Sequence, residues 1–209
     1  MRATVLISGG IDSPVVAYIM AEAGADVVLL HMDNGEYGDP RELQKVKRLA
    51  AQLSKVTGKD MPLYIADHEI NQKEIGHSCE TGYRCVMCKR TMHRVAKLFS
   101  QQHGCDAVVL GDSLGQVASQ TLRNIRGEQL GLGFPVLRPL IGMDKNEIID
   151  IAKRIGTFDI SIMQSKGCKA VPSKPITEAS AEKVLRQQEA MDFDATVERS
   201  AASAELFVQ

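Results

Sequence analysis

The segment Ala3-Thr4-Val5-Leu6-Ile7-Ser8-Gly9-Gly10-Ile11-Asp12-Ser13-Pro14 decides the fold of this chain. Its first five residues are mostly apolar and predict a buried strand, and residues 14–20 predict a helix. Ser13 is expected to be the N-cap of that helix and Pro14 its first residue. Two glycines between a strand and a helix N-terminus predict an anion site, because free N–H groups and the helix dipole favour negative charge.

The glycine loop lacks the signatures of two common nucleotide-binding loops. No lysine follows the glycines, as the Walker pattern requires, and the dinucleotide fingerprint is incomplete here and at Gly131-Leu132-Gly133. The string Ser-Gly-Gly-x-Asp-Ser resembles the PP-loop of ATP pyrophosphatases. Those enzymes cleave ATP to AMP and pyrophosphate and leave an adenylated substrate. A plain glycine turn is the alternative, which a six-position match between a strand and a helix disfavours.

The composition is that of a globular chain without a strong net charge. The 209 residues suffice for one domain with a full core, and the formal net charge is −1. A nucleic-acid partner would therefore need a local basic patch or another subunit. We find no apolar run of membrane-spanning length and no signal-peptide pattern, so we expect a cytoplasmic protein without a membrane partner. The five cysteines favour metal or catalytic use over structural disulfides.

Strand-like and helix-like runs alternate along the chain, which predicts an α/β fold. The expected architecture is a Rossmann-like, doubly wound parallel sheet of five strands, at residues 3–7, 25–32, 62–67, 106–111 and 135–138. Ligands of such sheets bind at the carboxyl ends of the strands, where the glycine loop lies. We expect one domain over residues 1–175 and a polar helical extension, residues 176–209, packed on it.

Capping residues mark two of the expected helices. Asp39 precedes a helix that extends to about Val56, and Asp144 precedes one that ends at Ile155. A glutamate three residues after each aspartate, at positions 42 and 147, predicts a capping box at both helix starts.

A further helix is expected over residues 83–101, and one of its faces is basic. The residues that share this face are Arg90, His93, Arg94 and Lys97. The basic face is a candidate contact for the phosphates of a nucleic acid, and the alternative is an ordinary solvated face.

Cys85 and Cys88 form a Cys-x-x-Cys pair, and Cys168 lies in a later loop before Pro172. The pair alone fits a redox pair, half of a zinc site or half of an iron–sulfur site. Three cysteine ligands would hold a four-iron cluster and leave one iron open to bind sulfide. Plain core packing is a further alternative, and zinc would need a fourth ligand from His77, Cys79 or His93.

Several strings together resemble the catalytic half of tRNA 4-thiouridine synthetases, the ThiI family. They are Leu6–Val15, Cys88–Met92, Gly111–Thr121, Leu137–Gly142, Ile155–Thr157 and Cys168–Pro175. The match covers nearly the whole chain in order, and the string from 111 to 121 is the most specific. The resemblance implies an ATP-dependent sulfurtransferase that adenylates a carbonyl oxygen, that of a tRNA uridine, replaces it with sulfur, and releases AMP and pyrophosphate.

The resemblance also implies roles for individual residues. Nucleotide binding is expected from Leu6, Ile7, Ser8, Gly9, Gly10, Asp12, Ser13, His31, Met32, Lys89, Gly111 and Gln120. Catalytic roles are expected for Asp12, Lys89 and Cys168; Asp12 is a candidate Mg²⁺ ligand or, alternatively, only an acid at a helix N-terminus. Cys85, Cys88 and Cys168 are expected to hold a [4Fe-4S] cluster, as in the iron–sulfur branch of the family.

The expected cofactors are thus ATP, Mg²⁺ and a [4Fe-4S] cluster, and the expected partners are tRNA and a sulfur donor, either sulfide or a persulfide carrier. We expect no THUMP domain and no rhodanese domain, so a separate tRNA-binding subunit or the second chain of a homodimer would help to bind tRNA. Two alternatives remain. In the first, the adenylated acceptor is a small molecule, as in thiamine-related sulfur transfer or amide ligation. In the second, the chain binds a nucleotide and an iron–sulfur cluster without catalysis.

Overall fold

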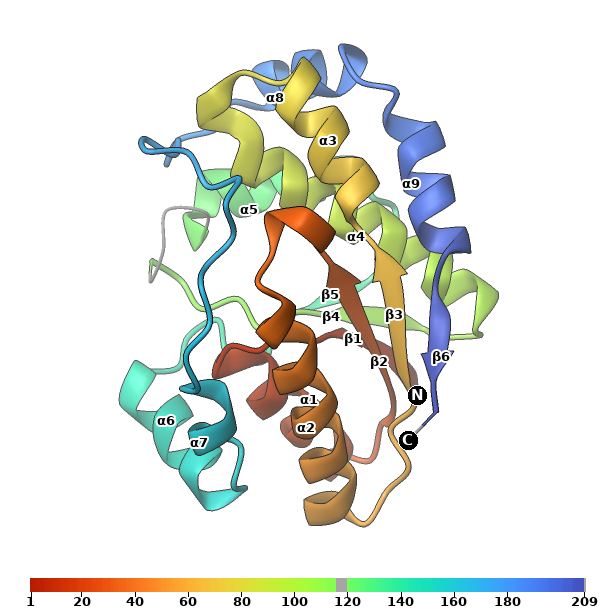
Figure 1. The fold of residues 1–209 in the computed structure, drawn as a ribbon, viewed down its shortest axis with the longest axis vertical. Coiled ribbons are helices and arrows are strands. Elements are labelled where there is room, and N and C mark those ends of the chain that lie inside the picture. The colour runs from red at the N-terminus through yellow and green to blue at the C-terminus, as the bar shows by residue number, and fades with distance from the viewer. Residues whose placement is uncertain (116–119, 209) are drawn as a thin grey trace.

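The structure is a computed structural model that describes residues 1–115 and 120–208. Outside the described residues lie Gln116, Val117, Ala118 and Ser119, which belong to the string 111–121 that resembles the ThiI family. The helices and strands alternate as predicted (Figure 1). In order, they are β1 (Arg2–Leu6), α1 (Asp12–Glu22), β2 (Asp26–Asp33), α2 (Pro40–Thr57), β3 (Leu63–Asp67), α3 (Glu69–Ser78), α4 (Arg84–Gln102), β4 (Ala107–Val109), α5 (Leu122–Gln129), β5 (Val136–Leu137), α6 (Lys145–Arg154), α7 (Phe158–Ser161), α8 (Ala181–Glu189), α9 (Phe193–Ala202) and β6 (Glu205–Phe207).

The strands form one sheet in the order β5-β4-β1-β2-β3-β6, and the first five of these are parallel as predicted. The prediction of five strands was short by one, because β6 pairs antiparallel with β3 at the edge of the sheet. β6 has only three residues, too few for a readable alternation, and it lies in a tail predicted to be helical. The strand order reverses at β1, the place where open parallel sheets bind ligands.

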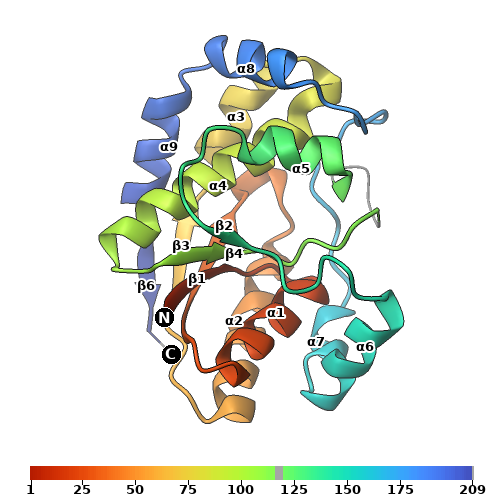
Figure 2. The same ribbon diagram turned by 180° about the vertical axis from the view of Figure 1, so that it is seen from behind.

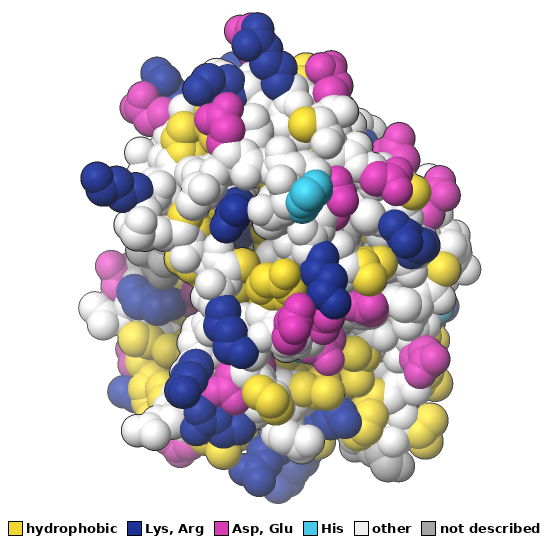
Figure 3. Space-filling model, turned by 45° about the horizontal axis from the view of Figure 1, so that its top comes forward, with side chains coloured by type: hydrophobic (Ala, Val, Ile, Leu, Met, Phe, Trp, Pro, Cys, Tyr) yellow, Lys and Arg dark blue, Asp and Glu magenta, His cyan; other side chains and the backbone are white. Residues whose placement is uncertain are grey.

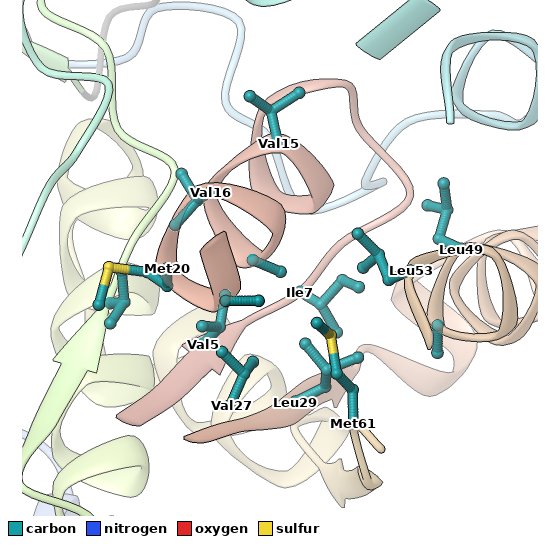
Figure 4. Packing of buried hydrophobic residues seen from close by; sticks show 14 of the residues in the cluster. Val5, Ile7, Val15, Val16, Met20, Val27, Leu29, Leu49, Leu53 and Met61 are labelled. Atoms are coloured by element: carbon teal, nitrogen blue, oxygen red, sulfur yellow. The ribbon is translucent and has the colours of Figure 1, made fainter. Parts of the chain in front are cut away.

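Helices cover both faces of the sheet, so a hydrophobic core lies on each side (Figures 1 and 2). Successive residues of β2 alternate between the two cores: Leu29 packs on one side, and Val28 and Leu30 on the other. Figure 4 shows Val5 and Leu29 of the sheet beside Leu53 of α2 in the first core. Among the described residues, no helix is long and apolar enough to cross a membrane.

The start of α1 differs from the prediction. The helix begins at Asp12, Ile11 is its N-cap without a side-chain cap, and Ser13 lies inside the first turn. The Ser13 hydroxyl accepts a hydrogen bond from Ser8 N–H at 2.9 Å and contacts the Ser8 carbonyl oxygen at 3.2 Å. The N-cap prediction for Ser13 was therefore wrong, because its hydroxyl closes the glycine loop onto the helix.

The starts of α2 and α6 confirm the two predicted aspartate caps, Asp39 and Asp144. The capping box is confirmed at α6, where Glu147 completes it. The box predicted at α2 was wrong, because the Glu42 carboxylate accepts a hydrogen bond from Gly9 N–H at 2.9 Å instead. This hydrogen bond ties the first turn of α2 to the glycine loop.

The basic face predicted on α4 points into the protein at two of its four positions. Arg90 is 1% exposed and His93 is 2% exposed. The Arg90 guanidinium donates to the carbonyl oxygens of Gly127 at 3.0 Å and Leu130 at 2.8 Å. These carbonyls lie at the C-terminal end of α5, where helix carbonyls lack partners within the helix and attract cations. The prediction that Arg90 and His93 contact RNA phosphates was therefore wrong.

The other two basic residues of this face are bound to the same segment. Arg94 donates to the carbonyl oxygens of Leu130 and Gly131, and Lys97 donates to that of Leu132, all within 2.9 Å. The basic face of α4 thus holds the turn after α5 in place.

We expect Arg90→Met to lower the free energy of unfolding by about 3 kcal/mol or more, because several buried carbonyls lose a charged donor. Urea unfolding measures this loss. Arg126→Met removes an exposed arginine from the last turn of α5 and should change the free energy of unfolding by less than about 0.5 kcal/mol. Equal effects of the two substitutions would contradict the structural role of Arg90.

Candidate functional site

Three neighbouring cavities lie at the carboxyl ends of the central strands. The loop cavity, about 470 Å³, lies between the glycine loop and residues 165–168. The central cavity, about 280 Å³, lies between the glycine loop and Lys89, and the cysteine cavity, about 250 Å³, contains the three cysteines of interest. Each pair of cavities shares a lining residue. Gly10 borders both the loop cavity and the central cavity, and Lys89 borders both the central cavity and the cysteine cavity. Cys168 borders both the loop cavity and the cysteine cavity.

Figure 3 views the molecule from the side of these strand ends and shows Lys and Arg side chains around a hollowed surface. Most residues predicted to bind a nucleotide line the loop or central cavity. They are Leu6, Ser8, Gly9, Gly10, Asp12, Ser13, Lys89, Gly111 and Gln120. Ile7, His31 and Met32 are buried in the sheet and are not among the residues that line the three cavities. The His31 ring contacts the Ile7 carbonyl at 3.0 Å, which links β2 to the end of β1.

Gly111 brings the end of β4 close to the glycine loop. A Cβ atom at position 111 would lie 3.0 Å from the nitrogen of Ser13 and 3.1 Å from its Cα. These are main-chain atoms of the first turn of α1, so they cannot rotate away from an added side chain. The glycine lets the chain segments after β1 and β4 meet at the point where the strand order reverses.

Lys89 reaches the central cavity from α4 and is held by a carboxylate. Its Nζ lies 2.8 Å from Asp112 Oδ1, and Arg138 Nε donates to the other oxygen of Asp112 at 3.0 Å. Burial opposes the charge on Lys89, but the nearby Glu128 and Asp112 carboxyls outweigh it and raise the Lys89 pKa. The site thus presents a cation at a fixed position. Sequence reasoning missed Asp112 and Arg138, because ion pairs over such separations have no local pattern.

Glu128 lies behind this ion-pair network and is fully buried. Within the part of the chain that the structure describes, neither oxygen of its carboxyl has a hydrogen-bond partner. Burial raises the pKa of Glu128 from 4.5 to about 8, although the neighbouring Lys89 lowers it. The carboxyl therefore stays mostly protonated in the folded chain at neutral pH, and its charge acts on Lys89 at higher pH, where it ionises.

We expect Glu128→Gln to stabilise the fold more at pH 8 than at pH 5. Because the pKa of the folded state is raised, the wild-type fold loses stability as the pH rises from about 4.5 to about 8, where the unfolded chain ionises and the folded chain keeps its proton. The stability difference between variant and wild type should therefore grow by about 1–3 kcal/mol across this window in urea unfolding. A pH-independent difference, like that expected for the exposed Glu198→Gln, would contradict the raised pKa.

Asp12 lies in the first turn of α1 and faces both the loop and a second helix. Its Oδ1 lies 2.5 Å from the Nζ of Lys145, the first residue of α6. Lys145 lines the loop cavity and Asp12 lines the central cavity. The pair places one carboxylate and one ammonium group beside the glycine loop, as expected for a site that binds a phosphate chain and a hard cation. Lys145 was not among the residues predicted from the sequence, because its ion pair with Asp12 joins distant parts of the chain.

The structure places Cys85, Cys88 and Cys168 on the wall of one cavity. Burial raises the pKa of Cys88 to about 12, and the other two thiols add to this effect. Its Sγ lies 3.2 Å from His68 Nε2 and 3.2 Å from Gln72 Nε2. Cysteine thiolates are the donors that hold iron–sulfur clusters, so the residue types in this cavity suit such a group.

The structure does not itself assign a metal. Among residues 1–115 and 120–208, no three His, Cys, Asp or Glu side chains are arranged to hold a metal ion. Of the alternative zinc ligands, His77 is exposed, and Cys79 is buried with its thiol 3.3 Å from Met191 Sδ. His93 lines the central cavity, not the cysteine cavity.

Comparison with known proteins identifies the family. A family model described as "Thiamine biosynthesis protein (ThiI)" matches residues 1–193. The chain belongs to the ThiI family. The ThiI match includes the glycine loop, Lys89 and all three cysteines of the cysteine cavity. It confirms the resemblance found in the sequence.

Two curated relatives are each described as "Probable tRNA sulfurtransferase". The relative from Methanothermobacter thermautotrophicus is 42% identical over 197 residues, which cover 90% of this chain and 49% of the relative. The relative from Caldanaerobacter subterraneus is 42% identical over 194 residues, which cover 92% of this chain and 51% of the relative. This ThiI chain therefore spans about half the length of the curated relatives it matches.

A solved structure described as a 4-thiouridine synthetase–RNA complex with bound ATP has the same fold. Its TM-score is 0.93 at 30% sequence identity, and the match covers 99% of this chain and 54% of that chain. The parallel α/β fold predicted from the sequence is thus confirmed by the fold shared with the 4-thiouridine synthetase, apart from the additional edge strand β6.

Proposed function

We propose that the chain is the catalytic part of an ATP-dependent tRNA sulfurtransferase. The reaction adenylates a uridine carbonyl oxygen, replaces it with sulfur, and releases AMP and pyrophosphate. The observation that carries this proposal is the contact between the cavities: Cys168 borders both the loop cavity and the cysteine cavity. A phosphate-binding loop and a sulfur-handling cysteine therefore share one site. The relatives described as tRNA sulfurtransferases support it.

In the adenylation step, ATP lies in the central cavity with its phosphates on the glycine loop. The carbonyl oxygen of the acceptor attacks the α-phosphate, and the bond to pyrophosphate breaks. Lys89 stabilises the charge that develops on the phosphate, and Asp112 holds Lys89 in position. Asp12 would hold a Mg²⁺ ion, which neutralises phosphate charge when bound. The ATP bound in the 4-thiouridine synthetase structure supports ATP as the nucleotide.

In the sulfur step, sulfur attacks the carbon that carries the adenylate, and AMP leaves with the oxygen. Cys85, Cys88 and Cys168 would hold a [4Fe-4S] cluster, which supplies an open iron that binds sulfide. Cys88 is fixed by His68 and Gln72, whereas Cys168 comes from a loop that also borders the ATP side. The three cysteines thus keep the sulfur source next to the adenylated carbon.

The proposed acceptor is a tRNA uridine, and sulfide or a persulfide carrier is the proposed sulfur donor. The RNA in the 4-thiouridine synthetase complex supports tRNA as the acceptor. We propose that a separate tRNA-binding subunit, or the second chain of a homodimer, adds contacts to the tRNA.

The adenylation half of this proposal is tested without sulfur. The chain is incubated with ATP, Mg²⁺ and tRNA transcribed without modifications, and pyrophosphate release is measured. We expect release that depends on tRNA and is lost when the target uridine is replaced by cytidine. Release that is independent of tRNA, or that follows addition of a small carbonyl compound instead, would contradict the proposal.

A further inference from the structure

An acidic side chain occupies the phosphate end of the site. Glu42 lines the loop cavity, and its Oε1 accepts the hydrogen bond from Gly9 N–H at 2.9 Å. Main-chain N–H groups of such loops are donors to phosphate oxygens. The Glu42 carboxylate therefore stands where a phosphate oxygen would receive the same hydrogen bond. A Cβ atom at position 9 would lie 2.4 Å from Glu42 Oε1, which shows how closely the carboxylate packs against the loop.

A buried lysine lies beside this carboxylate. Lys45 follows Glu42 by one helical turn of α2, lines the loop cavity, and is only 5% exposed. Its Nζ lies 3.6 Å from Glu42 Oε2 and 3.3 Å from the hydroxyl of Ser165. Both distances are long for charge-assisted hydrogen bonds, so the ammonium group has capacity for a stronger anionic partner. A buried ammonium without its carboxylate would be costly, which explains why Glu42 accompanies it.

We propose that the pyrophosphate end of ATP displaces the Glu42 carboxylate and binds both Gly9 N–H and Lys45. This inference rests on the proposed function and assigns two residues to its phosphate site. Glu42 neutralises Lys45 while the loop cavity is empty. An incoming pyrophosphate group carries more negative charge and more acceptor oxygens than one carboxylate, so it takes over the donors. Glu42 then competes with phosphate, whereas Lys45 attracts it.

The same helical turn links the phosphate site to the loop that carries Cys168. Asp39, the N-cap of α2, accepts a hydrogen bond from Lys166 N–H at 2.6 Å, and Lys45 contacts Ser165. Lys45 therefore binds the two sides of the loop cavity together. Pyrophosphate at this position would contact both the glycine loop and the segment before Cys168.

The two residues make opposite predictions for binding. Isothermal titration in the presence of Mg²⁺ measures the affinity of the chain for inorganic pyrophosphate, ATP and AMP. We expect Lys45→Met to weaken pyrophosphate and ATP by at least about tenfold, and Glu42→Gln to strengthen pyrophosphate by about threefold or more. AMP, which lacks the pyrophosphate end, should change by less than about twofold in both variants.

Matched controls remove charge elsewhere on the molecule. The first control is Lys55→Met, because Lys55 is exposed on α2. The second is Glu22→Gln, because Glu22 is exposed at the end of α1. Thermal unfolding of each variant confirms that the fold is intact, and Lys45→Gln repeats the test if Lys45→Met is unstable. Glu42→Gln keeps an acceptor for Gly9 N–H, so it changes the charge while retaining the hydrogen bond.

The outcomes separate this inference from the function on which it rests. Weaker pyrophosphate binding by Glu42→Gln would overturn the displacement, because Glu42 would then support the site. A Lys45→Met variant that binds like Lys55→Met would overturn the role of Lys45. Wild-type protein that binds neither ATP nor pyrophosphate would instead overturn the proposed function itself.

Discussion

Cys168→Ser is expected to abolish sulfur transfer while ATP binding stays within about twofold of the wild type. Cys168 is the cysteine that borders both the loop cavity and the cysteine cavity. Its loop is fixed by main-chain atoms on both sides: Lys166 N–H donates to Asp39 at 2.6 Å, and Lys169 N–H donates to the Tyr37 carbonyl at 2.8 Å. A serine therefore leaves the loop in place and removes only the thiol.

Two measurements check this expectation. Mass spectrometry of digested tRNA detects thionucleosides after an anaerobic reaction, and isothermal titration measures ATP binding. Cys105→Ala, a buried cysteine outside the cysteine cavity, is the control that should retain sulfur transfer. Thiolation by Cys168→Ser at the wild-type rate would remove Cys168 from the mechanism.

Asp12→Ala is expected to reduce tRNA-dependent pyrophosphate release by at least about 100-fold, because Asp12 is the carboxylate beside the glycine loop that would hold Mg²⁺. The loss of this ligand should also raise the Mg²⁺ concentration that gives half of the maximal rate. Asp60→Ala removes an exposed carboxylate between α2 and β3 and should leave the rate unchanged.

Asp12 also forms an ion pair with Lys145. The effect of losing this ion pair has to be separated from the effect of losing a Mg²⁺ ligand. If Asp12 acted only by holding α6 through Lys145, Asp12→Ala would lower thermal stability while the Mg²⁺ dependence stayed that of the wild type. An unchanged rate of pyrophosphate release would remove Asp12 from the mechanism altogether.

Most of the fold could be predicted from local patterns in the sequence. Apolar runs that alternate with helix-like segments predicted the five parallel strands. Such strands are apolar along their length because helices cover both of their faces. Asp39 and Asp144 predicted two helix starts, because a side-chain cap is a local interaction. Ser13 and Glu42 carry the same local signals, but their side chains bind the glycine loop instead. Tertiary contacts thus overrode the capping pattern at the functional site.

Helical periodicity predicted which residues of α4 share a face, but it could not predict what covers that face. Arg90 has the pattern of a solvated residue, but its partners include carbonyls about 40 positions later, at the end of α5, and the side chain of Gln188. Long-range ion pairs likewise leave no local pattern in the sequence, because the two partners are far apart: Asp12 and Lys145 are separated by 133 positions. The sequence therefore predicted the loop and the cysteines, but not the charged partners that hold Asp12 and Lys89 in place.

We propose that this chain thiolates a tRNA uridine at the expense of ATP. An anaerobic reaction of the reconstituted protein with ATP, Mg²⁺, sulfide and unmodified tRNA, at a high tRNA concentration, tests this proposal. Digested tRNA is then analysed by mass spectrometry. We expect thiouridine only when ATP is present. Protein that binds ATP and has been reconstituted with a cluster, yet forms no thiouridine, would contradict this proposal.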